Sequence, residues 1–467
     1  MTQIPVLNGT YTDSDADFRS SYPVNLVPVP KDNGIAKGYL RPADGIVKNG
    51  DGVGLDRGAI VWNGIHYRIQ GTSLVAVSQG GLTTVIGDVG GTGQVSMDYS
   101  FDRLAIASSG ALFYLFENEV VKVTDGDLGA VLDVVWVDGY FMTTDGTFLV
   151  VTDLDDPMAV NPLKYGSSEA DPDPISGLLK IRNEVYAINR HTIEVFDNIG
   201  GDLFPFQRIE GAQIQKGSLG THCACEIADS VAFLGSGRGE APAIYIGANG
   251  TANKISTREI DQILATYTEA QLSTSLLEKR VDKGHQHLMV HLPDRTIVYD
   301  LAGSAAVQEP LWFYLTSSIV DFAQYRGRNL VWIYERWYCA DPASTDMGYL
   351  DPSISTHYGQ IVRWEFGTTI IYNEGNGAVF HELELVCLTG RVALGIDPTI
   401  STSYSIDGQV WSDEKFVHVG SVGDRLRRIA WRRNGIMRNW RIQRFKGNSD
   451  SHISIARLEA QLEPLAV

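Results

Sequence analysis

The side chains best suited to binding a metal lie in one short run, His285-Gln286-His287-Leu288-Met289-Val290-His291. On a β-strand its three histidines would share one face, and Leu288 and Val290 would share the other. Two imidazoles two residues apart can bind zinc, and His222, Cys223 and Cys225 are further residues of ligand type. The same alternation is typical of a strand with one apolar and one polar face, and no set of ligands with established zinc spacing is complete. We therefore expect no metal and no other cofactor.

Two groups of carboxylates could support glycoside hydrolysis or bind calcium: Asp153-Leu154-Asp155-Asp156 and Asp171-Pro172-Asp173-Pro174. Both lie next to proline, where aspartate commonly caps a turn, so a turn is favoured. Ser405–Trp411 resembles the aspartate box of sialidase propellers, which is itself a structural turn. Gly90-Gly91-Thr92-Gly93 resembles a dinucleotide loop only by composition, because a strand follows it and not a helix. The sequence thus indicates no catalytic residues.

Strands must carry most of these residues, since short β-branched runs recur along the chain between Gly, Asp and Asn turns. Six dipeptides have the composition of tight hairpins, because Asn-Gly and Asp-Gly accept positive φ angles. They are Asn63-Gly64, Asp125-Gly126, Asp138-Gly139, Asp145-Gly146, Asn249-Gly250 and Asp407-Gly408. The predicted strands include Ala59–Trp62, Leu74–Val77, Leu112–Phe116, Val131–Val137, Phe148–Val151, Val185–Ile188 and Ile297–Tyr299. These patterns predict a mainly β protein.

A weak internal repeat runs through the middle of the chain. The segment from Val134 to Val150 is similar to the segment from Leu178 to Phe196, and each has the pattern of strand, turn, strand, turn and strand. Similar units begin near Val95, Ile227, His287 and Val320, at the spacing expected of propeller blades. The repeat predicts a β-propeller over residues 55–340.

The rest of the chain differs from this repeat. Residues 1–54 are rich in proline, which favours an extended N-terminal arm or platform that packs along other elements. Capping boxes at Ser256–Glu259 and Thr268–Gln271 predict a helical insert at about 256–283. Residues 341–360 have the composition of a linker, and the remainder of 341–467 is predicted to be a β-rich, sandwich-like platform module.

The charge is distributed unevenly. The 467 residues carry a net charge of −18, yet residues 421–467 hold ten basic and four acidic side chains, which leaves −24 on residues 1–420. We expect the basic segment to meet acidic surface on a neighbouring copy, although a solvated basic face has the same composition. An acidic body argues against DNA as a tightly held ligand.

The composition also indicates the cellular compartment in which the protein folds. There are four cysteines, no apolar run long enough to span a membrane and no signal peptide, so we expect a soluble protein from a reducing compartment with no membrane partner.

Several segments together resemble one family, the packaged-DNA stabilisation proteins, which are tail hub or nozzle components of short-tailed bacteriophages. No single motif is specific, and the order and spacing of the segments carry the resemblance. The segments are Asp17–Leu26, Gly38–Ile46, Gly91–Met97, Gln215–Thr221, Ala228–Phe233 and His291–Asp300.

This resemblance implies a non-enzymatic virion protein built from a propeller and a platform. Copies would form a homo-oligomeric ring, expected to be a hexamer, below the portal and the head-to-tail adaptor. The ring would extend the DNA channel, retain packaged DNA, and dock tail spikes or fibres and a plug or needle. On charge and composition we expect subunit and adaptor contacts at Phe18, Tyr22, Arg427, Arg428, Arg432, Arg433, Arg438 and Arg441. The alternatives are a glycan-processing propeller enzyme (a depolymerase or glycosidase) and a monomeric scaffold.

Overall fold

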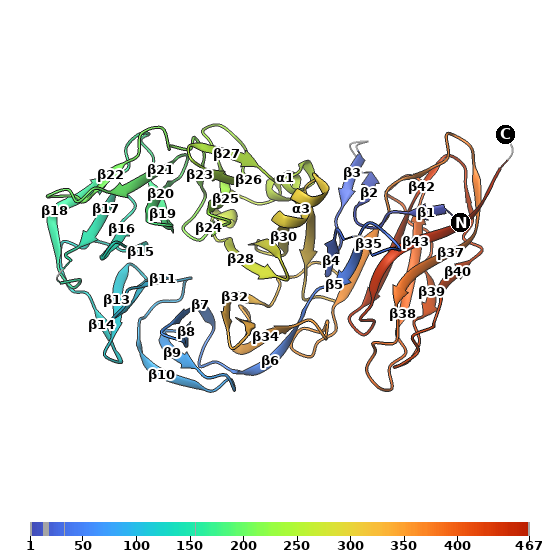
Figure 1. Ribbon diagram of the computed structural model, residues 1–467, viewed down its shortest axis with the longest axis horizontal. Helices are drawn as coiled ribbons and strands as arrows, with labels where there is room; N and C mark the ends of the chain where they lie inside the picture. Colours follow the sequence, from blue (N-terminus) through green and yellow to red (C-terminus); the bar gives the residue numbers. More distant parts are fainter. Residues whose placement is uncertain (1, 13–17, 32, 155, 466–467) are drawn as a thin grey trace.

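The computed structural model describes residues 2–12, 18–31, 33–154 and 156–465. Two residues of the sequence arguments, Asp17 and Asp155, lie outside these ranges. The predicted mainly β fold is confirmed: the protein consists of a β-propeller followed by a β-sandwich, and the two lie side by side along the long axis of the molecule (Figure 1). No helix in the described ranges is both long and apolar enough to cross a membrane.

Seven antiparallel sheets form the blades within the described residues. The first blade contains β7 (Asp56–Trp62), β8 (Ile65–Gln70), β9 (Ser73–Val77) and β10 (Thr83–Asp88), and the second contains β11 (Ser96–Tyr99), β12 (Leu104–Ser108), β13 (Ala111–Phe116) and β14 (Glu119–Lys122). The third blade contains β15 (Asp133–Val137), β16 (Tyr140–Thr144), β17 (Phe148–Thr152) and β18 (Val160–Ser167). The fourth contains β19 (Ile175–Ile181), β20 (Glu184–Asn189), β21 (Ile193–Asn198) and β22 (Phe206–Arg208).

The fifth blade contains β23 (Gly217–Ser218), β24 (Ala224–Ile227), β25 (Ser230–Ser236), β26 (Ala243–Ala248) and β27 (Thr251–Lys254). The sixth contains β28 (Leu276–Asp282), β29 (His285–His291), β30 (Thr296–Asp300) and β31 (Trp312–Leu315). The seventh contains β32 (Arg328–Ile333), β33 (Arg336–Ala340), β34 (Asp346–Asp351) and β6 (Gly45–Asp51). All seven predicted strands lie within or overlap blade strands. The unit start predicted near Val95 agrees with β11, whereas those near Ile227 and His287 fall inside blades.

The propeller is closed by the N-terminal strand β6, which pairs antiparallel with β34 from Tyr349↔Val47 to Asp351↔Gly45. β6 thereby completes the seventh blade, and the chain runs from it directly into β7 of the first blade. Ile46 is fully buried and packs in one cluster with Phe313 and Leu315 of the sixth blade. Residues 45–51 therefore form part of the propeller, although they lie inside the segment predicted to be an arm.

The sandwich contains strands from both ends of the chain. One sheet has the order β4 (Leu26–Val29), β5 (Tyr39–Pro42), β43 (Ser454–Pro464), β37 (Ala378–Leu388) and β40 (Ile429–Arg432), with β1 (Thr2–Ile4) and β41 (Ile436–Met437) paired alongside. The other contains β35 (Arg363–Gly367), β42 (Trp440–Asn448), β38 (Thr399–Ser405) and β39 (Lys415–His418), with β36 (Ile371–Tyr372) on β42. A separate hairpin of β2 (Gly9–Thr12) and β3 (Phe18–Ser21) completes the N-terminal part.

The helical insert is shorter than predicted. It consists of α1 (Arg258–Ala265) and α2 (Glu269–Leu272), because the following residues pair with β29 as strand β28. The capping box at Thr268 is present, but the first one is not, since Thr257 is the N-cap of α1 and its side chain makes no cap hydrogen bond. A further helix, α3 (Leu301–Val307), was not predicted. The predicted linker over 341–360 contains β34 and is partly a blade strand.

Candidate assembly interface

The two aromatic residues predicted as contacts lie in different environments. Phe18, at the start of β3, is 63% exposed and stands edge-on to Trp440 of β42, with ring centroids 6.4 Å apart. Tyr22 is buried, and its hydroxyl lies 2.7 Å from Thr257 Oγ1 at the start of α1. Burial raises the pKa of this phenol. Phe18 is thus available to a partner, whereas Tyr22 anchors the N-terminal segment to the propeller, so the prediction of Tyr22 as a contact is corrected.

Five of the six predicted arginines are exposed on the sandwich: Arg427, Arg428, Arg432, Arg433 and Arg438. Two of them already meet acidic residues of the neighbouring strand β37. Arg428 Nη2 lies 2.9 Å from Glu382 Oε1 and also pairs with Glu384, and Arg432 Nε lies 3.3 Å from Glu382 Oε2. The carboxylates hold the pKa of Arg428 above its usual value.

Arg441 is a correction to the predicted interface. Its side chain is fully buried in the sandwich, between the rings of Phe380 and Tyr404 at 4.0 and 4.1 Å. The guanidinium donates to the backbone oxygen of Asn434 and to Gln443. Burial lowers its pKa to about 10. Arg441 is a packing residue, because strand β42 turns it inward and no partner can reach it.

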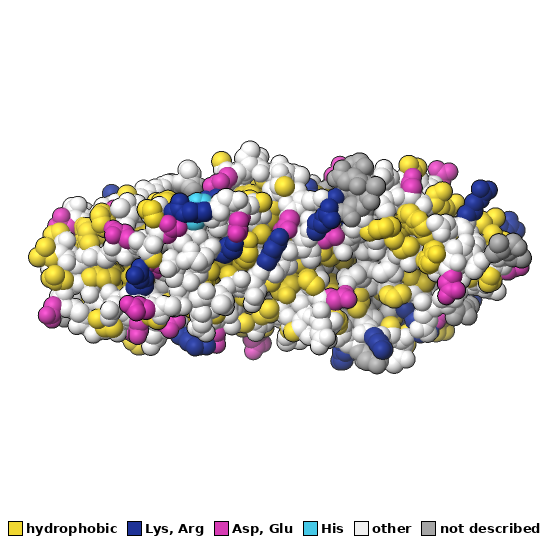
Figure 2. Space-filling view, turned by 90° about the horizontal axis from the view of Figure 1, so that it is seen from above, with side chains coloured by type: hydrophobic (Ala, Val, Ile, Leu, Met, Phe, Trp, Pro, Cys, Tyr) yellow, Lys and Arg dark blue, Asp and Glu magenta, His cyan; other side chains and the backbone are white. Residues whose placement is uncertain are grey.

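A further surface was not found by sequence reasoning. The loops that follow β37 and β39 lie side by side, since Gly423 N donates to Gly390 O and Thr389 Oγ1 donates to Asp424 O. They expose Leu394 (89%) and Leu426 (95%). Loops have no periodicity, so sequence gives no signal for such exposed leucines. Figure 2 shows other hydrophobic side chains exposed over the sandwich and the blades on one face.

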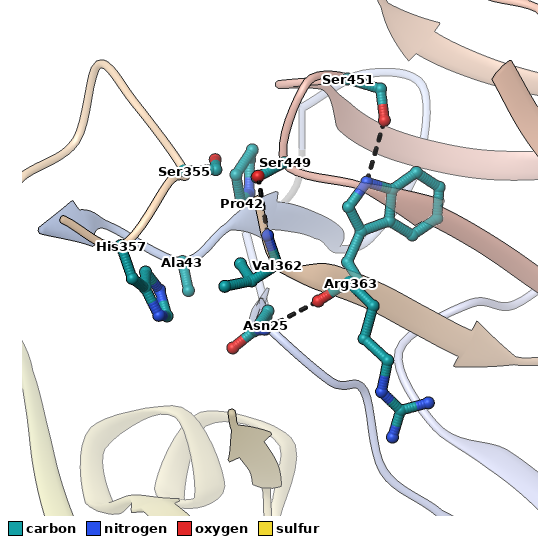
Figure 3. A pocket seen from close by; sticks show the side chains of 10 residues that line it. Asn25, Pro42, Ala43, Ser355, His357, Val362, Arg363, Ser449 and Ser451 are labelled. Carbon is teal, nitrogen blue, oxygen red and sulfur yellow. Dashed lines mark hydrogen bonds between the residues drawn. The ribbon is translucent and has the colours of Figure 1, made fainter. Parts of the chain in front are cut away.

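The junction of propeller and sandwich is organised by Asn25, which has a left-handed backbone with φ of 51°. Its side-chain amide donates to Thr316 O at 2.9 Å, next to β31, and to Arg363 O at 2.7 Å, on β35. Its side-chain oxygen accepts from Thr316 N at 3.0 Å. Asn25 lines a cavity of about 10 Å³, with room for roughly one water, to which Ser449 and His357 also contribute (Figure 3). One side chain therefore connects the two domains.

Acid should weaken this junction through His357, whose pKa burial lowers to about 3. Unfolded histidine titrates near 6.5, so the unfolded chain binds the proton first as the pH falls. The free energy of unfolding is then largest above pH 6.5 and decreases toward pH 3. The loss from His357 alone should be about 2 kcal/mol between pH 6.5 and pH 5. Chemical denaturation at a series of pH values measures it.

The control for this pH prediction is His357→Gln, which can still bond to Ser317; His357 Nδ1 lies 2.8 Å from Ser317 Oγ. Its stability should fall less steeply between pH 6.5 and pH 5. Equal slopes for the two proteins would contradict the assignment to His357.

The carboxylates considered for catalysis form turns and surface ion pairs. Asp173 accepts from the backbone of His191, Asp171 pairs with Arg238 at 2.8 Å, and Asp153 pairs with Lys164 at 2.8 Å. Asp407 accepts from the backbone N–H groups of the two residues after Gly408, so the box-like segment is a turn.

The glycine cluster at residues 90–93 is also structural. Arg57 donates to the carbonyls of Gly90 and Gly93, both at 2.6 Å. These bonds hold the cluster in place through its carbonyl oxygens, and the turn interpretation fits this geometry.

The histidine run is buried from His287 to His291, so the polar solvent face of the sequence interpretation is limited to its first residues. His287 and His291 are 2% and 0% exposed, and His291 Nε2 lies 2.7 Å from Glu278 Oε1. In the described residues, one group of at least three residues could hold a metal, namely His285, His287 and Asp300. His222, Cys223 and Cys225 do not join it.

The fold and these surfaces define a two-domain protein in which a propeller is joined to a sandwich. A family profile described as "Bacteriophage P22 Gp10, beta-propeller" matches residues 2–355, and one described as "Bacteriophage P22 Gp10, beta-sandwich" matches residues 363–463. The chain therefore belongs to the P22 Gp10 family of packaged-DNA stabilisation proteins, and it is a structural tail hub protein of the virion. The family resemblance noted in the sequence is confirmed.

Among curated proteins, the chain is 29% identical over 485 residues to the tail hub protein gp10 of Salmonella phage P22, covering 99% of both chains. Among solved structures, the N-terminal domain of Nup159 (TM-score 0.43, 10% identity) covers 67% of this chain and 96% of its own. The Pan2 WD40 domain of Neurospora crassa (TM-score 0.43, 10% identity) covers 66% of this chain and 95% of its own.

Proposed function

We propose that copies of this chain form a closed ring, a hexamer, below the portal and the head-to-tail adaptor of the phage. The ring extends the DNA channel and retains the packaged genome. The observation that carries this proposal is the similarity to the P22 tail hub protein, which spans 99% of both chains and so includes the propeller and the sandwich together.

The distribution of charge supports contacts between unlike ends of neighbouring copies. Residues 98–156, in the second and third blades, contain twelve acidic and two basic residues, a net charge of −10. These blades lie at the end of the molecule opposite the sandwich, which carries the arginine-rich segment 421–467 (Figure 1). A contact between two different patches of identical chains closes into a ring when its rotation closes. We assign the arginine-rich surface of one copy to the acidic blades of the next.

Exposed apolar side chains accompany both charged ends. Phe101 (91% exposed) and Leu163 (69%) belong to the acidic blades, and Leu394 and Leu426 belong to the sandwich loops. Apolar burial supplies most of the free energy of association, while the opposite charges set which ends meet.

The other faces of the ring are left for the remaining tail parts, which we propose to be spikes or fibres and a plug or needle. DNA passes through the channel without tight binding, because the acidic body repels phosphate. We propose no catalytic activity, since the candidate carboxylates serve turns and ion pairs. The glycan-processing alternative would need two carboxylates about 5–10 Å apart in a cleft.

Reconstitution with purified portal and adaptor tests the ring. Mixed with the portal–adaptor complex, the chain should give particles with one added ring of fixed copy number in negative-stain images. Persistent monomers in the presence of that complex would contradict the hub proposal. Monomers of the isolated chain would not, because assembly can require the adaptor as a template.

Charge reversal tests the sandwich as the contact surface. The Arg432→Glu/Arg433→Glu variant should reduce ring yield by about tenfold, because like charges then face each other, without changing the unfolding midpoint. The matched control is Arg182→Glu/Arg336→Glu, which makes the same charge change on exposed propeller residues. Ring yield by sedimentation on the portal–adaptor complex is the measurement. A wild-type yield from the first variant, or an equal loss in the control, would remove the interface assignment while leaving the hub role intact.

A further inference from the structure

Three residues of the sixth blade converge on one face of its sheet. His287 and Asp300 are direct partners across the antiparallel pair β29–β30, so their side chains project to the same side. His285 lies two residues before His287 and therefore shares that face. His285 Nδ1 lies 2.6 Å from Asp300 Oδ2, and the ligand atoms of all three residues lie within 4.8 Å of one another.

One ring nitrogen of His287 is buried and makes no hydrogen bond within the described residues. The residue is 2% exposed, and its Nε2 has no hydrogen-bond partner among the residues that the structure describes. A buried polar atom without a partner costs about 1–3 kcal/mol, and bound water or an ion commonly explains such an atom. Asp300 is also held in place, since its Oδ1 accepts from Gly303 N at 3.0 Å, at the start of α3.

The charged side chains around this group include one carboxylate that no arginine neutralises. Arg41 and Arg280 are the basic side chains here, and both are engaged by carboxylates: Asp44 pairs with both arginines, and Asp282 pairs with Arg41. Asp300 is the third carboxylate and has neither guanidinium as a partner. The five charged side chains sum to −1, and Asp300 places that charge at the site itself.

We propose that His285, His287 and Asp300 form a binding site for a divalent ion of the zinc class. Two imidazole nitrogens and one carboxylate oxygen are a common ligand set for zinc, and water would complete a tetrahedron. The ion takes the place of the hydrogen bond between His285 Nδ1 and Asp300 Oδ2, and the neutral imidazole then carries its proton on Nε2. The side chain of His285 is 23% exposed and opens the site to solvent. The site ties β29 to the β30–α3 corner, beside the charged residues that connect the sixth blade to β5.

Titration of the tag-free, full-length chain tests the site. Isothermal titration with ZnCl₂ should show one ion per chain, and Co²⁺ should give the visible absorption of a tetrahedral or five-coordinate ion. Saturating Zn²⁺ should raise the unfolding midpoint by about 2 °C. His285→Ala, at a partly exposed position, should abolish all three signals.

Two further variants make the result decisive. His287→Gln should also abolish binding, so the conclusion does not depend on one substitution. The control is His381→Ala/His418→Ala, which removes two surface histidine–carboxylate pairs, with Glu463 and Asp397, that could bind zinc adventitiously. This control should bind as wild type does. Absence of binding in the wild type, binding that survives His285→Ala, or binding lost in the control would overturn the proposal.

Discussion

Replacing Ile46 by aspartate should open the propeller and lower the free energy of unfolding by about 4 kcal/mol. Ile46 lies at 0% exposure on the closing strand β6 and packs against Phe313 and Leu315. An aspartate there would place a carboxylate in an apolar cluster without a partner and would remove aliphatic packing as well. Because β6 joins the last blade to the first, the loss should affect the whole propeller cooperatively.

Chemical denaturation followed by tryptophan fluorescence measures this effect. The control is Lys48→Ala on the same strand, where the side chain is 46% exposed and pairs with Asp51 and Asp346 at the surface. It should leave the denaturation midpoint unchanged, because exposed ion pairs contribute little. If Ile46→Asp unfolds at the wild-type midpoint, the closing role of β6 is wrong.

Local patterns predicted the strands well because the signals are themselves local. At Asn63-Gly64, Asp138-Gly139 and Asn249-Gly250 both residues have positive φ, as tight hairpins require. The propeller and the sandwich followed from strand density and spacing. The helical insert was predicted too long because Leu272 and Leu276 have a helical spacing after the second capping box, yet pairing with β29 makes Leu276–Asp282 a strand.

The features that sequence could not give depend on pairings between distant residues. The sequence of strand β6 is polar over Lys48–Asp51, and its partner β34 is about 300 residues away along the chain. Arg441 has the type of a surface residue, and only its alternation along a buried strand sends it inward between Phe380 and Tyr404. The sequence pattern places His291 on the same strand face as His285 and His287. In the structure Glu278 and Tyr325 contact His291, and Asp300 lies beside the other two histidines.

The junction between the domains matters for a hub, since the proposed ring contacts use the sandwich of one copy and the propeller of the next. Rotation between the two domains would change the angle between neighbouring copies, and with it the number of copies that closes the ring. A rigid junction is therefore a requirement of the proposed ring. β4 pairs with β5, β5 pairs with β43, and β6 pairs with β34, so one N-terminal segment is part of both domains.

Replacing Asn25 by alanine should lower the free energy of unfolding by about 3 kcal/mol and uncouple the two domains. The variant leaves Thr316 N, Thr316 O and Arg363 O without the side-chain amide that now joins them. Calorimetry should show two transitions where the wild type shows one, because the propeller and the sandwich would then unfold separately.

The matched control is Asn63→Ala, since Asn63 has the same left-handed backbone, with φ of 50°, but lies exposed in a hairpin turn. It carries the cost of alanine at positive φ, about 1 kcal/mol, without the loss of buried hydrogen bonds. The difference between the two variants isolates the contribution of the amide bridge. Equal losses, or a single transition in Asn25→Ala at the wild-type midpoint, would show that the paired strands alone hold the domains together. In that case the rigidity of the hub would rest on β5 and β6, and on no single side chain between the domains.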